Sequence, residues 1–317
     1  MDHLLIRRHV AAFGAVLALA GCSATGADGA SGNTEPRVSA TPAMLKTVGI
    51  SFPLDAYEAT PEQSDTLTRA QGLLTGQCMA QLGFTYRAPE QHVPSASKSN
   101  SRVFGLSDPE TAAQFGYRNP AISDVPAKPN QGNPPTEAEM LALNGPADLK
   151  PSDLPKNLDE AQKSGGSSVK FNGKAVPVGG CVRESFLKLY ARKANEVDIL
   201  FVFNLKGEAE SKTREDSRVR AVNKRWSECM AKAGYKVTDP IQATKELGLS
   251  GVDLSGPTAV TAAKADVRCK QEVNLVGVHY AVTTAYQRQL VEKHGETLAL
   301  VKQQLESRLQ LAASLTR

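Results

Sequence analysis

Cysteine is the residue type with the clearest chemistry in this 317-residue chain. After Cys22 four cysteines remain, and an even number in an oxidising compartment favours disulfides. There is no Cys-x-x-Cys spacing, so neither a thioredoxin-like redox pair nor a zinc knuckle is indicated. Four cysteines allow three pairings, and none of them would be a nucleophile if all were bridged. The four are Cys78, Cys181, Cys229 and Cys269.

Three histidines follow the first 22 residues: His92, His279 and His294. His279 and His294 would stand roughly 22 Å apart on one helix, so they could not share a metal ion. Neither has a glutamate or histidine at the spacing of a zincin motif. We therefore expect these side chains to be polar or interfacial residues rather than ligands.

Other residue types offer no distinct catalytic pattern. Met79 and Met230 could bind a soft metal, but their place beside a buried cysteine favours core packing. Carboxylates such as Glu272 cannot be distinguished from ordinary surface charge. No Gly-x-Ser-x-Gly elbow and no phosphate-binding glycine loop occurs. We predict no catalytic residue, no metal site, no cofactor and no enzymatic activity.

The N-terminus has the pattern of a signal peptide. Arg7 and Arg8 precede an uncharged run, residues 10–20, which is about half of the roughly 20 apolar residues that a membrane-spanning helix needs. The run ends in Leu-Ala-Gly-Cys, which resembles the lipobox of bacterial lipoproteins. That resemblance implies a diacylglyceryl thioether on Cys22 and a mature chain that starts there. Two acyl chains would give lasting membrane attachment. The alternative is an ordinary secretory signal with Cys22 unmodified.

Two stretches, CMAQLGFTY from residue 78 and CMAKAGYKV from residue 229, are nearly the same. Before the first, Thr60, Pro61 and Gln63 form a capping pattern, which predicts a helix over residues 61–82. Gly83 then suits a left-handed helix stop, and the aromatic residue after it can cover the end. The predicted buried stripe of this helix is Leu67, Ala70, Leu74, Cys78 and Leu82.

The second copy has the same features. Asp216 or Ser217 can cap its helix, and Gly234 can end it. Its predicted buried stripe is Val219, Val222, Trp226, Cys229 and Ala233. Four basic residues lie mostly off that stripe, and we interpret them as a solvated face rather than a binding patch. They are Arg218, Arg220, Lys224 and Arg225.

Each copy is followed by one more cysteine that opens another helical pattern. An end-of-helix cysteine meets a start-of-helix cysteine in an antiparallel helical hairpin, so we predict disulfides joining Cys78 to Cys181 and Cys229 to Cys269. The predicted fold is mainly α, with two disulfide-stapled antiparallel helical hairpins, a long C-terminal helix, one small β-hairpin at Asn172-Gly173 and a long loop-rich insertion.

The chain divides by composition and pattern into four predicted parts. Residues 1–21 are a lipoprotein signal peptide, and residues 22–44 are a flexible tether poor in large apolar residues. Residues 45–212 form a first helical module that contains the insertion, at about 87–180. Residues 213–317 form a second module.

The second module ends in a proline-free helical stretch over residues 258–315, where Gly277 and Gly295 can mark a bend or a break. Its late apolar stripe is Leu298, Val301, Leu305, Leu309 and Ala312.

The repeated Cys-Met-Ala-x-x-Gly-Phe/Tyr motif and the segment from residue 218 to 287 resemble a family of actinobacterial secreted proteins and lipoproteins without assigned function. The resemblance implies a lipid anchor outside the cytoplasmic membrane of a Gram-positive bacterium, and it offers no catalytic residue to carry over.

These observations favour a non-enzymatic interaction protein of the cell envelope. Its C-terminal helix or its insertion would dock to a membrane or envelope partner. Lipidated Cys22 would attach the protein to the membrane. An alternative is a lipoprotein that captures a peptide, an antibiotic or a wall fragment between the two modules. An envelope hydrolase is a further alternative. The formal charge of +4 is too slight to imply nucleic acid.

Overall fold

The structure is a computed structural model that describes residues 35–44, 46–88, 100–120 and 134–315. Cys22, the signal peptide and most of the tether lie outside the described residues, as does His92. Residues 1–35 group apart from residues 36–317, which form one unit by their contacts. The fold described below is that of the second unit.

Helices make up nearly all of the regular structure in the described residues, as predicted. The first half contains η1 (Pro53–Tyr57), α1 (Pro61–Gln81), α3 (Pro109–Phe115), α4 (Glu137–Asn144), η2 (Pro151–Asp153), α5 (Leu158–Ser164), β1 (Lys170–Phe171), β2 (Lys174–Ala175) and α6 (Gly180–Tyr190). The second half contains α7 (Phe201–Glu215), α8 (Ser217–Lys232), α9 (Ala243–Glu246), η3 (Gly251–Ser255), α10 (Pro257–Glu272), α11 (Leu275–Lys293) and α12 (Gly295–Leu315).

The caps of α1 and α8 confirm the predicted starts of both helices. The Thr60 hydroxyl accepts the Gln63 amide proton, and the Gln63 side chain accepts the Thr60 amide proton. The Asp216 carboxylate accepts the amide proton of Arg218 at 3.0 Å, so Asp216 rather than Ser217 is the cap of α8.

The repeated motif is a helix stop of the Schellman type at both places. The Phe84 amide donates to the Met79 carbonyl, and the Tyr235 amide donates to the Met230 carbonyl, each at 2.9 Å. The glycine before each aromatic residue has a left-handed backbone, with φ of 90° at Gly83 and 91° at Gly234. The ring of each aromatic residue packs in the same apolar cluster as the methionine whose carbonyl accepts its backbone amide. The spacing of methionine, glycine and aromatic residue is therefore the spacing that this stop requires.

The predicted β-hairpin is also present. Lys170 pairs with Ala175 and Phe171 with Lys174, and the two turn residues have positive φ, 51° at Asn172 and 74° at Gly173. Positive φ at both central residues is the geometry of the type I′ turn that Asn-Gly favours.

The C-terminal stretch is three helices, and its breaks differ in part from the prediction. One break falls at Asn274, which has φ of 52°, and the other at His294 and Gly295. Gly277 does not break the chain but lies inside α11. A Cβ atom at Gly277 would come 1.9 Å from the Pro42 carbonyl oxygen, so the absent side chain makes room for the N-terminal segment.

Contacts of that N-terminal segment correct the predicted tether at its end. The Pro42 carbonyl accepts a hydrogen bond from Asn274, and the Pro36 carbonyl accepts one from Arg218. Val38 packs against the apolar cluster of α7 and α11. Residues 36–44 are thus part of the folded unit, although their composition resembles that of a linker.

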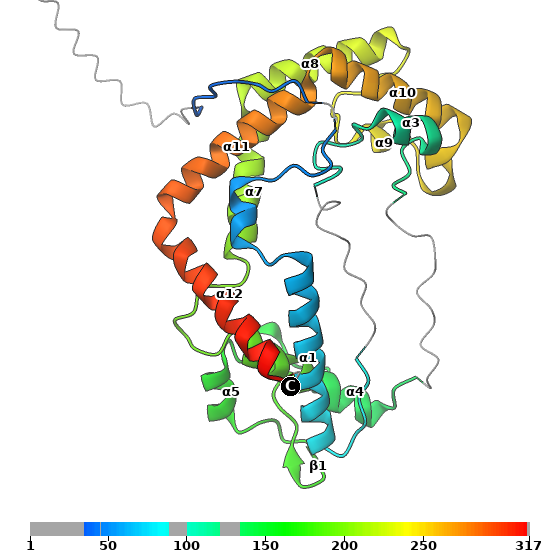
Figure 1. Ribbon diagram of the computed structural model, residues 1–317. Coiled ribbons are helices and arrows are strands. Elements are labelled where there is room, and N and C mark those ends of the chain that lie inside the picture. The colour runs from blue at the N-terminus through cyan, green and yellow to red at the C-terminus, as the bar shows by residue number, and fades with distance from the viewer. Residues whose placement is uncertain (1–34, 45, 89–99, 121–133, 316–317) are drawn as a thin grey trace, which may run out of the picture. The chain divides into compact units, whose positions relative to one another are not determined.

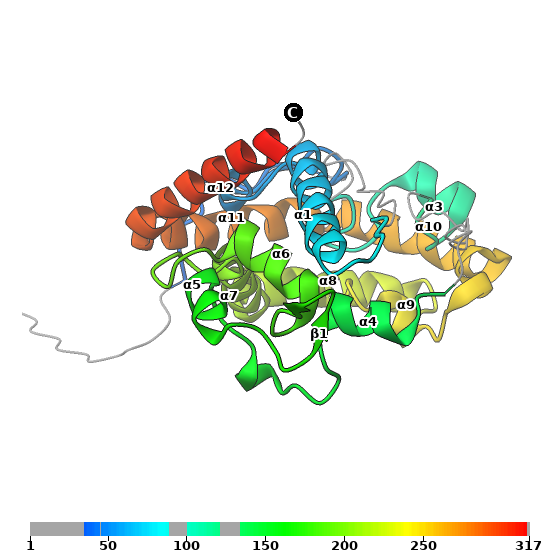
Figure 2. The same ribbon diagram turned by 90° about the horizontal axis from the view of Figure 1, so that it is seen from below.

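Packing also joins the two predicted modules. The boundary predicted at residue 212 falls inside α7, which packs on α8 and α11. The helix α12 lies beside α1 and α6, and α3, from the predicted insertion, lies along α10 (Figures 1 and 2). Leu106, Ala112 and Tyr117 of the insertion are in the same core as Trp226. The insertion is therefore partly core structure and not only surface loop.

Candidate functional site

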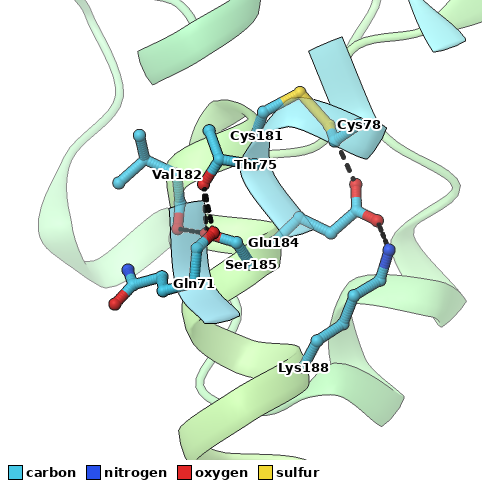
Figure 3. The surroundings of a disulfide bond; sticks show 8 residues. All are labelled: Gln71, Thr75, Cys78, Cys181, Val182, Glu184, Ser185 and Lys188. Carbon is cyan, nitrogen blue, oxygen red and sulfur yellow. Dashed lines mark hydrogen bonds and ion pairs between the residues drawn. A yellow bond between two sulfur atoms is a disulfide. The ribbon is translucent and has the colours of Figure 1, made fainter. Parts of the chain in front are cut away.

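The disulfide between Cys78 and Cys181 is present as predicted and is closed off from solvent. It joins the last turns of α1 to the first turn of α6, with the two Cα atoms 5.6 Å apart. Close to the disulfide, the Thr75 hydroxyl donates to the Ser185 hydroxyl at 2.9 Å, an interaction drawn as a dashed line in Figure 3. Glu184 lies 3.4 Å from the Cys78 sulfur, a contact rather than a hydrogen bond because a disulfide sulfur carries no proton. Both cysteines are buried, so this bond is structural.

The disulfide between Cys229 and Cys269 is also present, with Cα atoms 5.7 Å apart. One premise of its prediction is wrong, because Cys269 lies near the end of α10 and not at the start of a helix. The bond therefore ties the last turns of α8 and α10 together. Glu272 ends α10 beside this bond, with its carboxylate 3.6 Å from the Cys229 sulfur.

Met79 and Met230 are buried in the core, as expected. His279 is buried too, and its Nε2 lies 2.7 Å from the Asn223 amide oxygen. Burial, with the charge of Lys270 as a second cause, lowers the pKa of His279 to about 4. His294 ends α11, with its ring in edge contact with Phe201. The two histidines do not come together.

The basic residues of α8 do not all behave as predicted. Arg220, Lys224 and Arg225 are exposed. Arg218 is not part of a solvated face, because its guanidinium binds the buried Asp216 carboxylate at 2.6 Å and the Pro36 carbonyl at 2.9 Å. The Tyr286 hydroxyl donates to the same carboxylate at 3.2 Å. Arg218 thus ties three segments of the chain together.

A buried ion pair in α10 was missed by sequence reasoning. Asp266 and Lys270 have no exposed side-chain surface, and their charged groups lie 3.2 Å apart. The Lys270 ammonium also donates to the carbonyls of Leu106 at 2.9 Å and Pro240 at 3.3 Å. The Trp226 indole donates to the other Asp266 oxygen at 2.9 Å. Desolvation raises the pKa of Asp266 and lowers that of Lys270. The sequence shows only that Asp266 and Lys270 share one face of a helix, a spacing that is also typical of exposed pairs.

No group of three or more histidine, cysteine, aspartate or glutamate side chains suited to a metal ion occurs in the described ranges. Within the same ranges, no helix is long and apolar enough to cross a membrane.

An exposed apolar surface lies at the start of α7. Ile199, Leu200 and Phe203 are 42%, 54% and 67% exposed; Ile199 and Leu200 directly precede α7, and Phe203 lies in its first turn. We call these three residues the apolar rim. Ile199 and Phe203 also line a groove of about 290 Å³, the rim groove, formed by η1, α1, α7, α12 and the end of α6.

The apolar rim was missed because the sequence pattern from residue 181 to 205 predicts one helical segment. In the structure α6 ends at Tyr190, and α7 begins only at Phe201. The intervening loop turns the first apolar residues of ILFVF outward, while Val202 and Leu205 enter the core. The run of five consecutive apolar residues, longer than an amphipathic stripe needs, was the available signal.

The predicted apolar stripe of α12 is used inside the molecule. Leu298 and Ala312 are fully buried, and the residues between them pack against the clusters of α1 and α7. Arg308 of α12 donates to the Tyr190 carbonyl at 3.1 Å.

Comparison with models of protein families, with curated proteins and with solved structures finds no match for the chain. The resemblance to an actinobacterial lipoprotein family therefore stays a prediction.

Proposed function

We propose that this chain is a lipid-anchored, extracytoplasmic and non-enzymatic interaction protein of the cell envelope, which docks to a protein partner through the apolar rim. The exposure of Ile199, Leu200 and Phe203 beside the rim groove carries the proposal. Large exposed apolar side chains that lie close in the chain and beside a groove are often part of a protein interaction site. Docking by the C-terminal helix is less well supported, because the apolar stripe of α12 already packs internally.

Charge around the rim favours a protein segment over the bilayer as the occupant. Glu58 and Arg308 line the rim groove, Glu58 is paired with Lys206 at 2.7 Å, and Asp198 accepts the amide proton of Leu200 at 2.7 Å. Insertion of the rim into a membrane would desolvate these charged groups. The groove instead offers apolar floor residues together with polar groups of Ser64 and Thr68. An amphipathic segment with two or three apolar side chains fits this chemistry.

The lipid anchor rests on the N-terminal sequence alone. The mass of the N-terminal peptide from the protein isolated from membranes tests it directly. A peptide that begins at Cys22 and carries acyl chains supports the anchor. An unmodified N-terminus downstream of Cys22 would leave a secreted protein without a lipid anchor.

Docking is tested with a double variant, Leu200→Ser with Phe203→Ser, isolated from cells after chemical crosslinking. We expect it to lose an envelope protein that the wild type retains, because serine removes the apolar contact area. The matched control is Val252→Ser with Leu300→Ser, which changes two exposed apolar residues outside the rim, 89% and 50% exposed. Equal recovery of the partner with both double variants would refute docking at the rim.

A further inference from the structure

Arg308 of α12 is a buried cation in the wall of the rim groove. It is 8% exposed, and it lines the groove together with apolar residues of α1, α7 and α12. Those apolar residues are Leu67, Val202, Val301 and Leu305. A charge in such surroundings costs free energy unless it is paired, and desolvation accordingly lowers the pKa of Arg308.

The Arg308 guanidinium uses only part of its hydrogen-bonding capacity. Its Nη2 atom donates to the Tyr190 carbonyl at 3.1 Å, and its Cζ atom lies 5.6 Å from the centre of the Tyr190 ring. The Gln304 amide is 3.5 Å from Nη2, but its favoured orientation pairs it with the Val197 backbone. In the described ranges Nε and Nη1 have no hydrogen-bond partner, and neither atom is sealed from solvent. A guanidinium has five N–H donors, so most of those of Arg308 are open to a ligand.

Arg308 also forms no ion pair with a carboxylate in the part of the chain that the structure describes. Glu196 is the carboxylate whose charge favours the Arg308 cation, but it is paired with Arg192 at 3.8 Å and accepts the Arg192 amide proton at 3.1 Å. Glu58, at the same groove, is paired with Lys206. The rim groove therefore combines apolar surface with a buried positive charge that lacks its own counterion.

We propose that the partner segment in the rim groove carries a glutamate or aspartate between apolar residues, and that this carboxylate pairs with Arg308. The proposal rests on docking at the apolar rim and adds the charge that the partner must have. Charge-assisted hydrogen bonds from a guanidinium to a carboxylate are stronger than neutral ones, and weak hydration suits arginine to pairs in apolar surroundings. A neutral or basic segment would cover the groove but leave Arg308 unpaired, which is unfavourable.

Calorimetric titration of the detergent-solubilised full chain with two matched peptides tests the proposal. The probes are N-acetyl-Leu-Glu-Leu-amide and N-acetyl-Leu-Gln-Leu-amide, which have nearly the same shape and differ by one charge. We expect the wild type to bind the glutamate peptide about tenfold more tightly, because its carboxylate pairs with a desolvated cation. Arg288→Gln, which changes an exposed arginine of α11 outside the groove, should keep this preference.

Arg308→Gln separates charge recognition from a purely structural role. It should lower the affinity for the glutamate peptide to that for the glutamine peptide, and it should leave the affinity for the glutamine peptide unchanged. An equal loss of affinity for both peptides would mean that Arg308 only shapes the groove, which would overturn the proposal. Equal affinity of the wild type for both peptides, or no heat of binding with either, would overturn it as well.

A third probe, N-acetyl-Leu-Gln-Leu with a free terminal carboxylate, identifies the source of the carboxylate. We expect it to bind more weakly than the glutamate peptide, and tighter binding would replace the acidic side chain by a chain end. Failure of this proposal is distinct from failure of docking. Loss of the preference for glutamate refutes the acidic partner alone, whereas docking is refuted by recovery of the crosslinked partner from the double variant Leu200→Ser with Phe203→Ser.

Discussion

At the scale of single residues, the buried pair of Asp266 and Lys270 links several segments of the core. Every charged group in it has partners, and these come from α8, α10, and the loops at Leu106 and Pro240. A buried ion pair contributes little net stability, but loss of one partner leaves an uncompensated charge. The pair therefore makes the packing of the insertion onto α10 sensitive to a single side chain.

Lys270→Met should lower the free energy of unfolding by about 3–5 kcal/mol, because the lysine charge no longer offsets the burial of the Asp266 carboxyl group. The double variant Lys270→Met with Asp266→Asn should be more stable than Lys270→Met alone, since no charge remains and the amide can still accept from Trp226. Urea denaturation followed by circular dichroism measures both. Lys264→Met, at an exposed position of α10, is the control. A loss below about 1 kcal/mol for Lys270→Met would contradict the ion-pair assignment.

His279 gives the fold a specific acid sensitivity. Its pKa of about 4 in the folded state lies below the value near 6.5 expected in the unfolded chain. The neutral form is favoured in the folded state, so its contribution is complete above about pH 6.5 and is lost as the pH falls towards 4. We expect the free energy of unfolding to fall by up to about 3 kcal/mol between pH 6.5 and pH 4. His279→Gln should flatten this part of the stability profile, and His294→Gln is the matched control. A wild-type profile that matches that of His279→Gln would contradict this account.

At the scale of elements, the repeated motif has one structural meaning, a helix stop joined to a disulfide. Gly83 and Gly234 have left-handed φ in otherwise open surroundings, since a Cβ atom would meet nothing closer than 3.8 Å. A side chain at either position would therefore lower stability through backbone strain at positive φ and not through steric overlap with neighbouring atoms.

Gly83→Ala and Gly234→Ala should each destabilise the protein by about 1 kcal/mol. Gly207→Ala is a matched control, because Gly207 has helical φ inside α7 and a Cβ atom there would have no neighbour within 4 Å. It should instead stabilise by about 0.5–1 kcal/mol. Thermal unfolding of the three variants measures the contrast, and equal effects of all three would contradict the left-handed stop.

Elements with local signals were predictable from the sequence, and their assembly was not. The capping box at Thr60, the Asn-Gly turn and the glycine stops each depend on a few adjacent residues, and all are confirmed. The position of Cys269 near a helix end was missed because the break at Asn274 lacks a glycine or proline. The apolar rim was missed because exposure of Phe203 depends on where the loop before α7 turns, which is a property of long-range packing.

At the scale of the whole molecule, the described residues of 36–317 make one unit whose apolar helix stripes are largely satisfied internally. This is why we assign docking to the apolar rim, where large apolar side chains remain exposed. The predicted anchor at Cys22 would restrict that unit to the neighbourhood of the membrane, since 14 residues from Cys22 to Pro36 can span at most about 50 Å. With that anchor in place, the proposed partner would be an envelope protein.

The most direct test of docking is photo-crosslinking in living cells, with a photoreactive amino acid at position 203 of the full chain. The same residue at position 252, which is also open to solvent but lies outside the rim, is the reference. We predict that position 203 yields one reproducible adduct with an envelope protein and that position 252 does not. Adducts only with lipid or with a second copy of this chain, or the same adducts from both positions, would contradict docking of a protein partner at the rim.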